Sequence, residues 1–177
     1  KLKPVIIILG EPHSIFIEIL FKIYKKVFIS KIKRPLILIG SKKLLERQMF
    51  FFKYKYKINE ILIKDIPLVK DNKNINIINI NLKTKKTFFR DTPNSTQYLT
   101  KSFDTALKIL KKKIAIGLIN GPINKTSFLK KRYEGVTEYL VNLTKSNNYS
   151  MIIYNKKLSV SPITTHIPIK KVIKHLN

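Results

Sequence analysis

Histidine is the side chain in this 177-residue sequence that best combines acid–base chemistry with metal binding near neutral pH, and it occurs three times. His166 directly follows a strand-like segment, His13 lies in an early loop, and His175 lies in a lysine-rich helical stretch where we expect it on the surface. A metal site usually needs three or more protein ligands, and this sequence does not supply an evident set. An isolated histidine at a strand end is also often bonded to a carbonyl group, so the residue type leaves both roles open for His166.

A second candidate site would bind an anion. Residues 135–138 (GVTE) are typical of a helix start, where free backbone N–H groups and the Thr137 hydroxyl could hold a phosphate or carboxylate. Thr137 could equally be only a helix cap. Lys125 would add a cation, although most lysines in so lysine-rich a chain are ordinary solvated ones. We assign no catalytic residue.

Several other kinds of chemistry are excluded or disfavoured. Cysteine is absent, which rules out a thiol nucleophile and Cys-ligated zinc or iron–sulfur sites. Neither G-x-G-x-x-G nor G-x-x-x-x-G-K-[ST] occurs, so a Rossmann or P-loop enzyme is disfavoured, and no Ser-His-Asp set is evident.

Three loops follow strand-like segments directly: residues 10–12 (GEP), 120–122 (NGP) and 164–168 (TTHIP). If the strands are parallel, these loops share one edge of the sheet, where open α/β sheets bind ligands. Two of them combine glycine with proline in a chain with only five glycines, which indicates positive φ or a close approach of a ligand. Tight turns without a ligand would explain each loop singly, but three on one edge favour a site.

The elements that position these loops alternate between apolar strands and amphipathic helices. The helix from 14 is apolar on most sides, so we predict that it is well buried. Asn94 and Gln97 resemble a capping box at the start of another helix. The pattern predicts an α/β fold with a mainly parallel sheet, in a single region 1–177 without an internal boundary. We expect strands over 4–9, 35–39, 75–80, 114–119, 151–154 and 158–164, and helices over 14–27, from 41, from 94, after 124, after 137 and from 169.

The composition excludes an intrinsically disordered chain, since 44% of the residues are hydrophobic. The net charge of +26 favours an anionic partner. However, the lysines are spread along the chain beside abundant isoleucine and asparagine, as an AT-rich genome would produce, so we do not expect nucleic acid as a partner. Apolar runs are too short to span a membrane and no secretory cleavage site precedes the first strand, which favours a cytoplasmic protein.

Most of the chain resembles the N-terminal half of the PdxA family, the 4-hydroxythreonine-4-phosphate dehydrogenases. That family shows G-E-P-A-G-I-G, T-x-P-I-x-K, G-H-T-E and T-x-H-I/L-P-L in this order and at similar spacing. The matching stretches are 4–18 (PVIIILGEPHSIFIE), 35–45 (PLILIGSKKLL), 114–125 (IAIGLINGPINK), 135–144 (GVTEYLVNLT) and 158–176 (LSVSPITTHIPIKKVIKHL).

The resemblance implies an isopropylmalate-dehydrogenase-like, three-layer α/β/α fold in a homodimer, incomplete in this chain. It implies NAD- or NADP-dependent oxidation and decarboxylation of 4-phosphooxy-L-threonine, a small phosphorylated substrate, in pyridoxal phosphate (vitamin B6) biosynthesis. A divalent metal (Zn, Mg or Co) held by three histidines would polarise the reacting hydroxyl group. His166 matches the first metal position and Thr137 a substrate-binding threonine.

The sequence also departs from the family pattern. The substrate-contacting histidine of G-H-T-E is Val136 here, and G-I-G of the first loop is replaced by residues 14–16 (SIF). The family chain is nearly twice as long, so we expect residues 1–177 alone to be an inactive fragment. Two alternatives stay open: a related sugar-acid-phosphate or diol dehydrogenase of the same superfamily, and a basic nucleic-acid-binding module. The exact substrate, the choice of NAD or NADP and the metal are not determined by the sequence.

Overall fold

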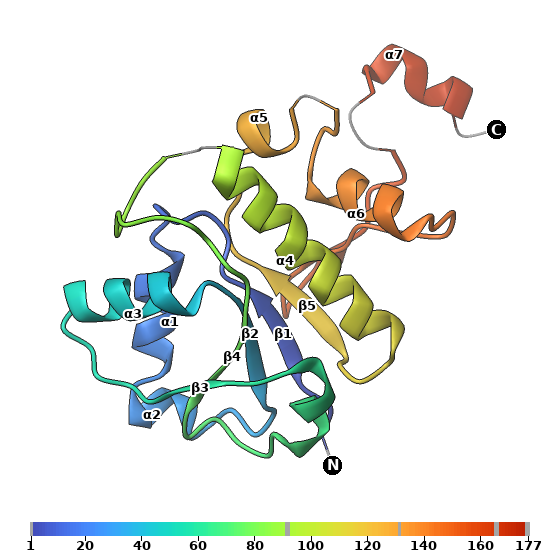
Figure 1. Ribbon diagram of the computed structural model, residues 1–177. Helices are drawn as coiled ribbons and strands as arrows, with labels where there is room; N and C mark the ends of the chain where they lie inside the picture. The colour runs from blue at the N-terminus through green and yellow to red at the C-terminus, as the bar shows by residue number, and fades with distance from the viewer. Residues whose placement is uncertain (1, 91–92, 131, 165–166, 176–177) are drawn as a thin grey trace. The chain divides into compact units, whose positions relative to one another are not determined.

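A computed structural model describes residues 2–90, 93–130, 132–164 and 167–175 (Figure 1). The chain separates into two compact units, residues 1–128 and 129–177, where the sequence analysis assigned no boundary. We describe each unit by itself.

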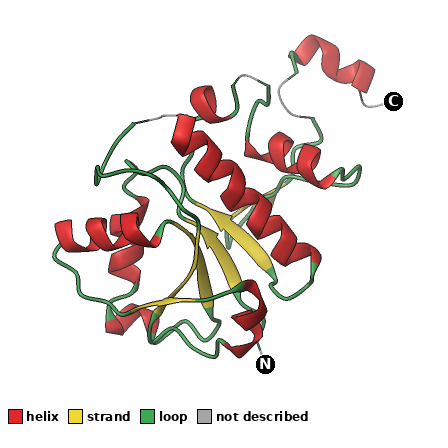
Figure 2. Ribbon diagram, in the orientation of Figure 1, coloured by secondary structure: helices red, strands yellow, loops and turns green. Residues whose placement is uncertain are grey.

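The first unit is built on a five-stranded, wholly parallel sheet with the strand order β3-β4-β2-β1-β5 (Figure 2). The inner strands β1 and β2 consist almost entirely of apolar, mostly buried residues, and β4 combines three buried isoleucines with Asn76 and Asn79, because both faces of the sheet are covered. The predicted α/β class with a mainly parallel sheet is therefore confirmed. The strands are β1 (Val5–Ile8), β2 (Leu36–Gly40), β3 (Ile58–Glu60), β4 (Ile75–Asn79) and β5 (Gly117–Asn120).

Helices cover both faces of this sheet and complete three layers. Alternate strand residues such as Ile7 and Leu38 face one way and form a core with Phe21 of α1 and Leu45 of α3. The long helix α4 covers the other face, with its buried stripe including Phe103 (Figure 1). The helices of this unit are α1 (Phe16–Ile23), α2 (Lys26–Ile29), α3 (Lys42–Phe51), the 3₁₀ helix η1 (Ile63–Leu68), α4 (Pro93–Lys111) and α5 (Lys125–Phe128).

Two predicted helix starts in the first unit, at Ser14 and at Asn94, are wrong, whereas the starts of α3 and α5 are confirmed. Ser14 does not cap α1; its N–H donates to the Glu11 carbonyl (3.2 Å) within a turn, so the helix starts two residues later. Asn94 lies inside α4, which starts at Pro93, a residue that suits a first helical position. Ser41 does cap α3, since its hydroxyl accepts a hydrogen bond from the Leu44 N–H (3.3 Å).

The expected single helix over 14–27 is divided into α1 and α2, and its predicted burial holds for one side only. Leu20 is buried, whereas Ile15 is 70% exposed and Ile19 is 44% exposed. The sequence analysis also missed β3 and η1. The strand expected over 114–119 begins later, at Gly117.

The second unit contains α6 (Val136–Thr144), the strands β6 (Ile153–Tyr154) and β7 (Ser159–Val160), α7 (Ile169–Val172) and the 3₁₀ helix η2 (Ile173–His175). The two strands pair antiparallel with each other and not with the parallel sheet. The expectation that the loop 164–168 follows a strand of that sheet is therefore wrong. No helix in the described parts of the two units is long and apolar enough to cross a membrane.

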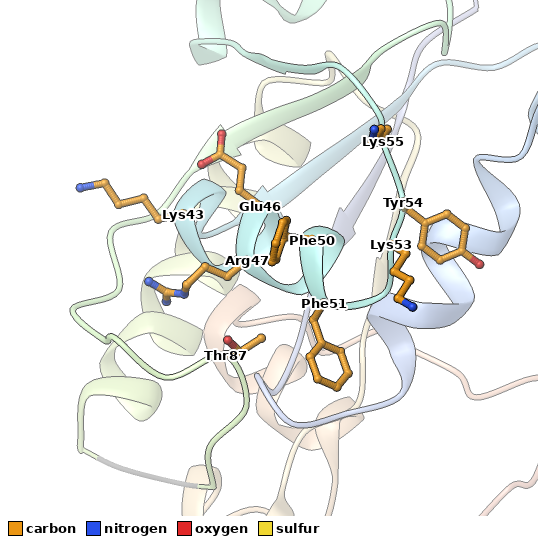
Figure 3. A pocket seen from close by; sticks show the side chains of 9 residues that line it. All are labelled: Lys43, Glu46, Arg47, Phe50, Phe51, Lys53, Tyr54, Lys55 and Thr87. Carbon is orange, nitrogen blue, oxygen red and sulfur yellow. The ribbon is translucent and has the colours of Figure 1, made fainter.

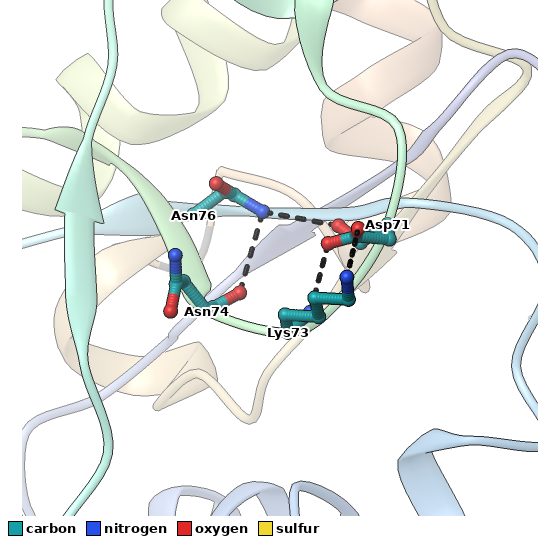
Figure 4. Close-up of polar contacts among 4 residues, drawn as sticks. All are labelled: Asp71, Lys73, Asn74 and Asn76. Atoms are coloured by element: carbon teal, nitrogen blue, oxygen red, sulfur yellow. Dashed lines mark hydrogen bonds and ion pairs between the residues drawn. The ribbon is translucent and has the colours of Figure 1, made fainter.

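The loop before β4 is held by asparagine side chains (Figure 4). Asn76 donates to the carbonyl groups of Asp71 (3.4 Å) and Asn74 (3.3 Å). Asn72 is only 6% exposed, and its side chain forms hydrogen bonds to the segment that enters β2. Its Oδ1 accepts from the Leu36 N–H (2.7 Å), and its Nδ2 donates to the carbonyl oxygens of Ile32 (3.1 Å) and Arg34 (3.0 Å). One amide group thus fixes the start of a central strand.

We expect Asn72→Ala to lower the free energy of unfolding by about 2–4 kcal/mol, because buried backbone groups would lose their partner. Asn94→Ala, at an exposed site on α4, is the control and should change stability by less than about 0.5 kcal/mol. Urea denaturation followed by circular dichroism measures both values. Equal stability of the two variants would contradict this role of Asn72.

Candidate functional site

The carboxyl end of the sheet has a switch point between β1 and β5. β1 pairs with β2 on one side and with β5 on the other, and the chain passes to β5 only after completing β2, β3 and β4. Ligands of open α/β proteins bind at this kind of boundary. The loops after β1 and β5 do meet there, as the parallel topology predicts: the Glu11 N–H donates to the Pro122 carbonyl (2.9 Å), and the Gly121 N–H donates to the Ile8 carbonyl (2.8 Å).

The close approach of these two loops requires glycine at one position in each of them. Gly10 has φ +74°, in the left-handed region, and a Cβ atom there would lie 2.6 Å from the Pro122 carbonyl oxygen. A Cβ atom on Gly121 would lie 2.6 Å from the Leu9 carbonyl oxygen. The sequence analysis indicated positive φ or close approach of a ligand; the structure shows positive φ at Gly10 and a close approach between the two backbones.

Glu11 links the first loop to the second through its side chain. Its carboxylate is 3% exposed, and Oε1 accepts a hydrogen bond from the Asn124 N–H (3.4 Å). Asn124 in turn caps α5, because its Oδ1 accepts from the N–H groups of Thr126 (2.9 Å) and Ser127 (3.2 Å). A buried carboxylate of one loop therefore positions the helix start of the other.

The interior between the ends of β1 and β2 is closed. A cavity of only ≈ 10 Å³, room for about one water molecule, remains there among residues that include Glu11, Ser41, Gln48 and Tyr98. The Gln48 amide, which lines this cavity, donates to the Pro12 carbonyl (2.7 Å). No space for a metabolite remains between these two strand ends, below the exposed rim of the sheet.

Tyr98 is the titratable group beneath Glu11. Burial raises the pKa of the Tyr98 phenol far above its usual value; a backbone hydrogen bond at Ser41 opposes this shift, and the charge of Glu11 adds to it. The phenol is therefore neutral at physiological pH. It is suited to hydrogen bonding within the core and not to proton transfer.

The rim itself carries exposed polar residues from both loops. His13 is exposed after β1, Asn120 is exposed at the end of β5, and Lys125 is exposed as the first residue of α5. Lys125 is thus available to an anionic ligand over the rim, and its role in binding stays a prediction.

In the second unit, the predicted helix start at 135–138 is confirmed. Gly135, in extended conformation, is the N-cap of α6, so the interpretation of Thr137 as the cap is wrong. Thr137 lies in the first turn of the helix, next to Val136, and both residues are half-buried. The Glu138 carboxylate lies at this helix start, since its Oε2 would be 2.9 Å from a Cβ atom on Gly135. The first turn thus presents N–H groups, a hydroxyl and a carboxylate together.

The predicted metal ligand His166 lies outside the described residues, as does the side chain of His175. Among the residues that the structure does describe, no group of three or more histidine, aspartate and glutamate side chains could hold a metal ion. The assignment of His166 to a metal therefore stays a prediction from the motif.

Residues 31–177 match the family model described as "Pyridoxal phosphate biosynthetic protein PdxA". Over 169 residues the chain is 33% identical to the 4-hydroxythreonine-4-phosphate dehydrogenase of Sulfurihydrogenibium sp., covering 94% of this chain and 50% of that protein. Over 83 residues it is 34% identical to the D-threonate 4-phosphate dehydrogenase of Pectobacterium atrosepticum, covering 42% of this chain and 26% of that protein. The chain thus spans about half the length of the first of these relatives.

Solved structures show the same fold. A putative 4-hydroxythreonine-4-phosphate dehydrogenase from Salmonella typhimurium superposes with a TM-score of 0.81 at 23% identity, over 98% of this chain and 54% of that one. The 4-hydroxythreonine-4-phosphate dehydrogenase from Burkholderia phymatum gives a TM-score of 0.82 at 22% identity, over 98% and 53%. At these identities the likeness concerns the fold, and it shows that the larger proteins continue well beyond the part matched here.

The contact between the two loops gives a prediction with a matched control. Gly121→Ala should lower the free energy of unfolding by about 1–3 kcal/mol, because the added methyl group collides with the β1 backbone. Gly117→Ala lies four residues earlier, where a Cβ atom meets nothing within 4 Å, and should leave stability unchanged or raise it by up to about 1 kcal/mol. Urea denaturation measures both, and wild-type stability of Gly121→Ala would show that the loops do not touch.

Proposed function

This chain belongs to the PdxA family, and from that premise we propose that it is the N-terminal part of an NAD- or NADP-dependent dehydrogenase that oxidises and decarboxylates 4-hydroxythreonine 4-phosphate in pyridoxal phosphate biosynthesis. The observation that carries the proposal is the 33% identity that extends over 94% of the chain to a relative named for that reaction. We further propose a cytoplasmic homodimer, on the basis of the family resemblance alone.

Within this chain, we assign substrate binding to the start of α6. The N–H groups of its first turn and the Thr137 hydroxyl suit a phosphate or carboxylate group. The Glu138 carboxylate beside Gly135 suits a cationic group, so the same turn fits a ligand that carries both charges, as an amino acid phosphate does. In the first unit, Lys125 offers a cation over the rim of the sheet.

We derive no reaction step through a metal, because the described residues do not assemble a ligand set. A divalent ion would act as a Lewis acid on the substrate hydroxyl group. The proposal that His166 supplies one ligand rests on the T-T-H-I-P motif, and the remaining ligands would come from outside this chain.

A second candidate function is the oxidation of D-threonate 4-phosphate. Among the relatives, the protein of Pectobacterium atrosepticum bears the name of that reaction. Val136, which replaces the histidine of the G-H-T-E motif, removes a polar group beside Thr137 and is compatible with a changed substrate. The two substrates differ at the amino group of threonine, which is a hydroxyl group in threonate.

The test is the rate of NAD(P)H formation with each of the two substrates. We expect no turnover by residues 1–177 alone, and turnover of 4-hydroxythreonine 4-phosphate by a chimera that joins this chain to the second half of the Sulfurihydrogenibium relative. Turnover by the isolated chain would refute the fragment proposal. A folded chimera that oxidises only D-threonate 4-phosphate would establish the second candidate, and one that oxidises neither would refute both.

Thr137→Val in the active chimera should raise the KM for the phosphorylated substrate by about tenfold or more, because a hydrogen bond to a charged group is lost. Thr144→Val, at the other end of the same helix, is the matched control: its hydroxyl bonds to the carbonyl groups of Leu140 and Val141, and KM should not change. Equal KM values for the two variants would remove Thr137 from the substrate site.

A further inference from the structure

A large open hollow lies over the C-terminal end of α3, on the side of the helix opposite its buried Leu44 and Leu45 (Figure 3). Its volume is ≈ 1060 Å³, against ≈ 10 Å³ for the cavity between the ends of β1 and β2. Of the stretches that match the family pattern, only 35–45 contributes to its lining, through Lys43. It is formed wholly within the first unit, by α3, the segment that follows it and Thr87.

Aromatic rings are exposed in this hollow. Phe50 is 86% exposed and Phe51 61% exposed. The Phe51 ring is fixed from behind by edge-on contacts with Phe52 (centroids 5.2 Å apart) and Phe88 (5.0 Å). A rigid ring with a free face is a ready platform for stacking, because little rotational freedom is lost when a ligand ring lies on it.

The third ring is Tyr54, which stacks on Tyr56 (5.7 Å between centroids, 17° between planes). Tyr56 is itself anchored, since its hydroxyl donates to the Phe21 carbonyl (2.9 Å). The ring of Tyr54 is therefore also held in place from the core side.

Cations surround these rings. Figure 3 shows Lys43 and Arg47 on one side of Phe50, and Lys53 and Lys55 on the other. The only acidic side chain among the residues lining this hollow is Glu46. The hollow therefore carries a net positive charge and suits an anionic ligand.

The backbone explains how both sets of cations reach one hollow. Lys53 has φ +56°, and its N–H donates to the Phe50 carbonyl (3.0 Å), which ends α3 in a left-handed turn. The chain then runs back past the helix end in a segment that alternates lysine and tyrosine, residues 53–57 (KYKYK). A second hollow of ≈ 550 Å³ shares Phe50 and Tyr54 and extends the groove to Lys57.

From this arrangement we propose that the α3 groove, defined by the residues of the two hollows, binds single-stranded nucleic acid without sequence preference. Exposed rings beside cations match a polymer in which bases alternate with phosphates: bases stack on Phe50 and Phe51, and phosphates contact the lysines and Arg47. Cations lie on both sides of Phe50, which matches the regularly spaced phosphates of a single strand (Figure 3). The lysine-rich composition explains the number of cations, but not their gathering with exposed rings in one groove. This function is additional to the proposed dehydrogenase activity and independent of it.

The test measures binding of residues 1–177 to a fluorescein-labelled oligothymidylate of about a dozen nucleotides by fluorescence anisotropy. Phe50→Ala should weaken binding by about fivefold or more, because one stacking platform is lost. Phe28→Ala, which removes a ring that is 55% exposed on α2, is the matched control and should bind as the wild type does.

The charge contribution is measured by the dependence of the binding constant on salt. The double variant Lys53→Ala/Lys55→Ala should reduce the slope of log K against log[salt] by about 1.4, as expected for two lost phosphate contacts on a single strand. Lys111→Ala/Lys112→Ala removes the same charge from the end of α4 and should leave the slope unchanged.

Equal losses in the groove and control variants would mean that binding reflects net charge alone, and would refute the proposal. The proposal would also be refuted if the protein bound anionic phosphatidylserine vesicles and not the oligonucleotide, and if Phe50→Ala abolished that vesicle binding. All six substituted positions are on the surface, so unchanged thermal unfolding of each of the four variants confirms that the comparison concerns binding.

Discussion

The backbone contact between the loops that follow β1 and β5 is the constraint on which the carboxyl edge of the sheet depends. Gly10 and Gly121 allow the backbones of the two loops to approach so closely that a Cβ atom at either position would collide with the other loop. The N–H of Glu11 and its carboxylate then bond to Pro122 and Asn124 of the opposite loop. Because Asn124 caps α5, the placement of Lys125 follows from that contact as well.

The parts of the fold that could be predicted from sequence are those where burial leaves a local signature. β1 and β2 are continuous apolar runs because both faces are covered, and both were predicted; β4 was predicted as well, from its three isoleucines. The start of α3 was predicted at Ser41, because this polar residue directly follows Gly40 and precedes the helix. β3 was missed because the edge strand Ile58–Glu60 has only a half-buried Ile58 and carries no apolar run.

The errors arose where a distant segment decides the local structure. Ser14 has the residue type of a cap, but residues 11–14 form a turn bonded across to the β5 loop, and α1 can start only after that turn. Two of the three strand-end loops met at one edge as predicted. The third follows a strand that pairs antiparallel within the second unit, and neither pairing partner nor direction is encoded in the apolar pattern of a short strand.

The closed space between the ends of β1 and β2 limits where a ligand can bind at the carboxyl edge of the sheet. The Gln48 amide, the Tyr98 phenol and the Glu11 carboxylate line a cavity there that has room for about one water molecule. Open α/β sheets bind ligands at the switch point, which in this sheet is the boundary between β1 and β5. At that boundary the two loops contact each other through Gly10 and Gly121, and Asn120 and Lys125 are exposed. A ligand over these exposed residues stays open to water on its outer side unless further protein covers it, and the relatives continue well beyond the part matched here.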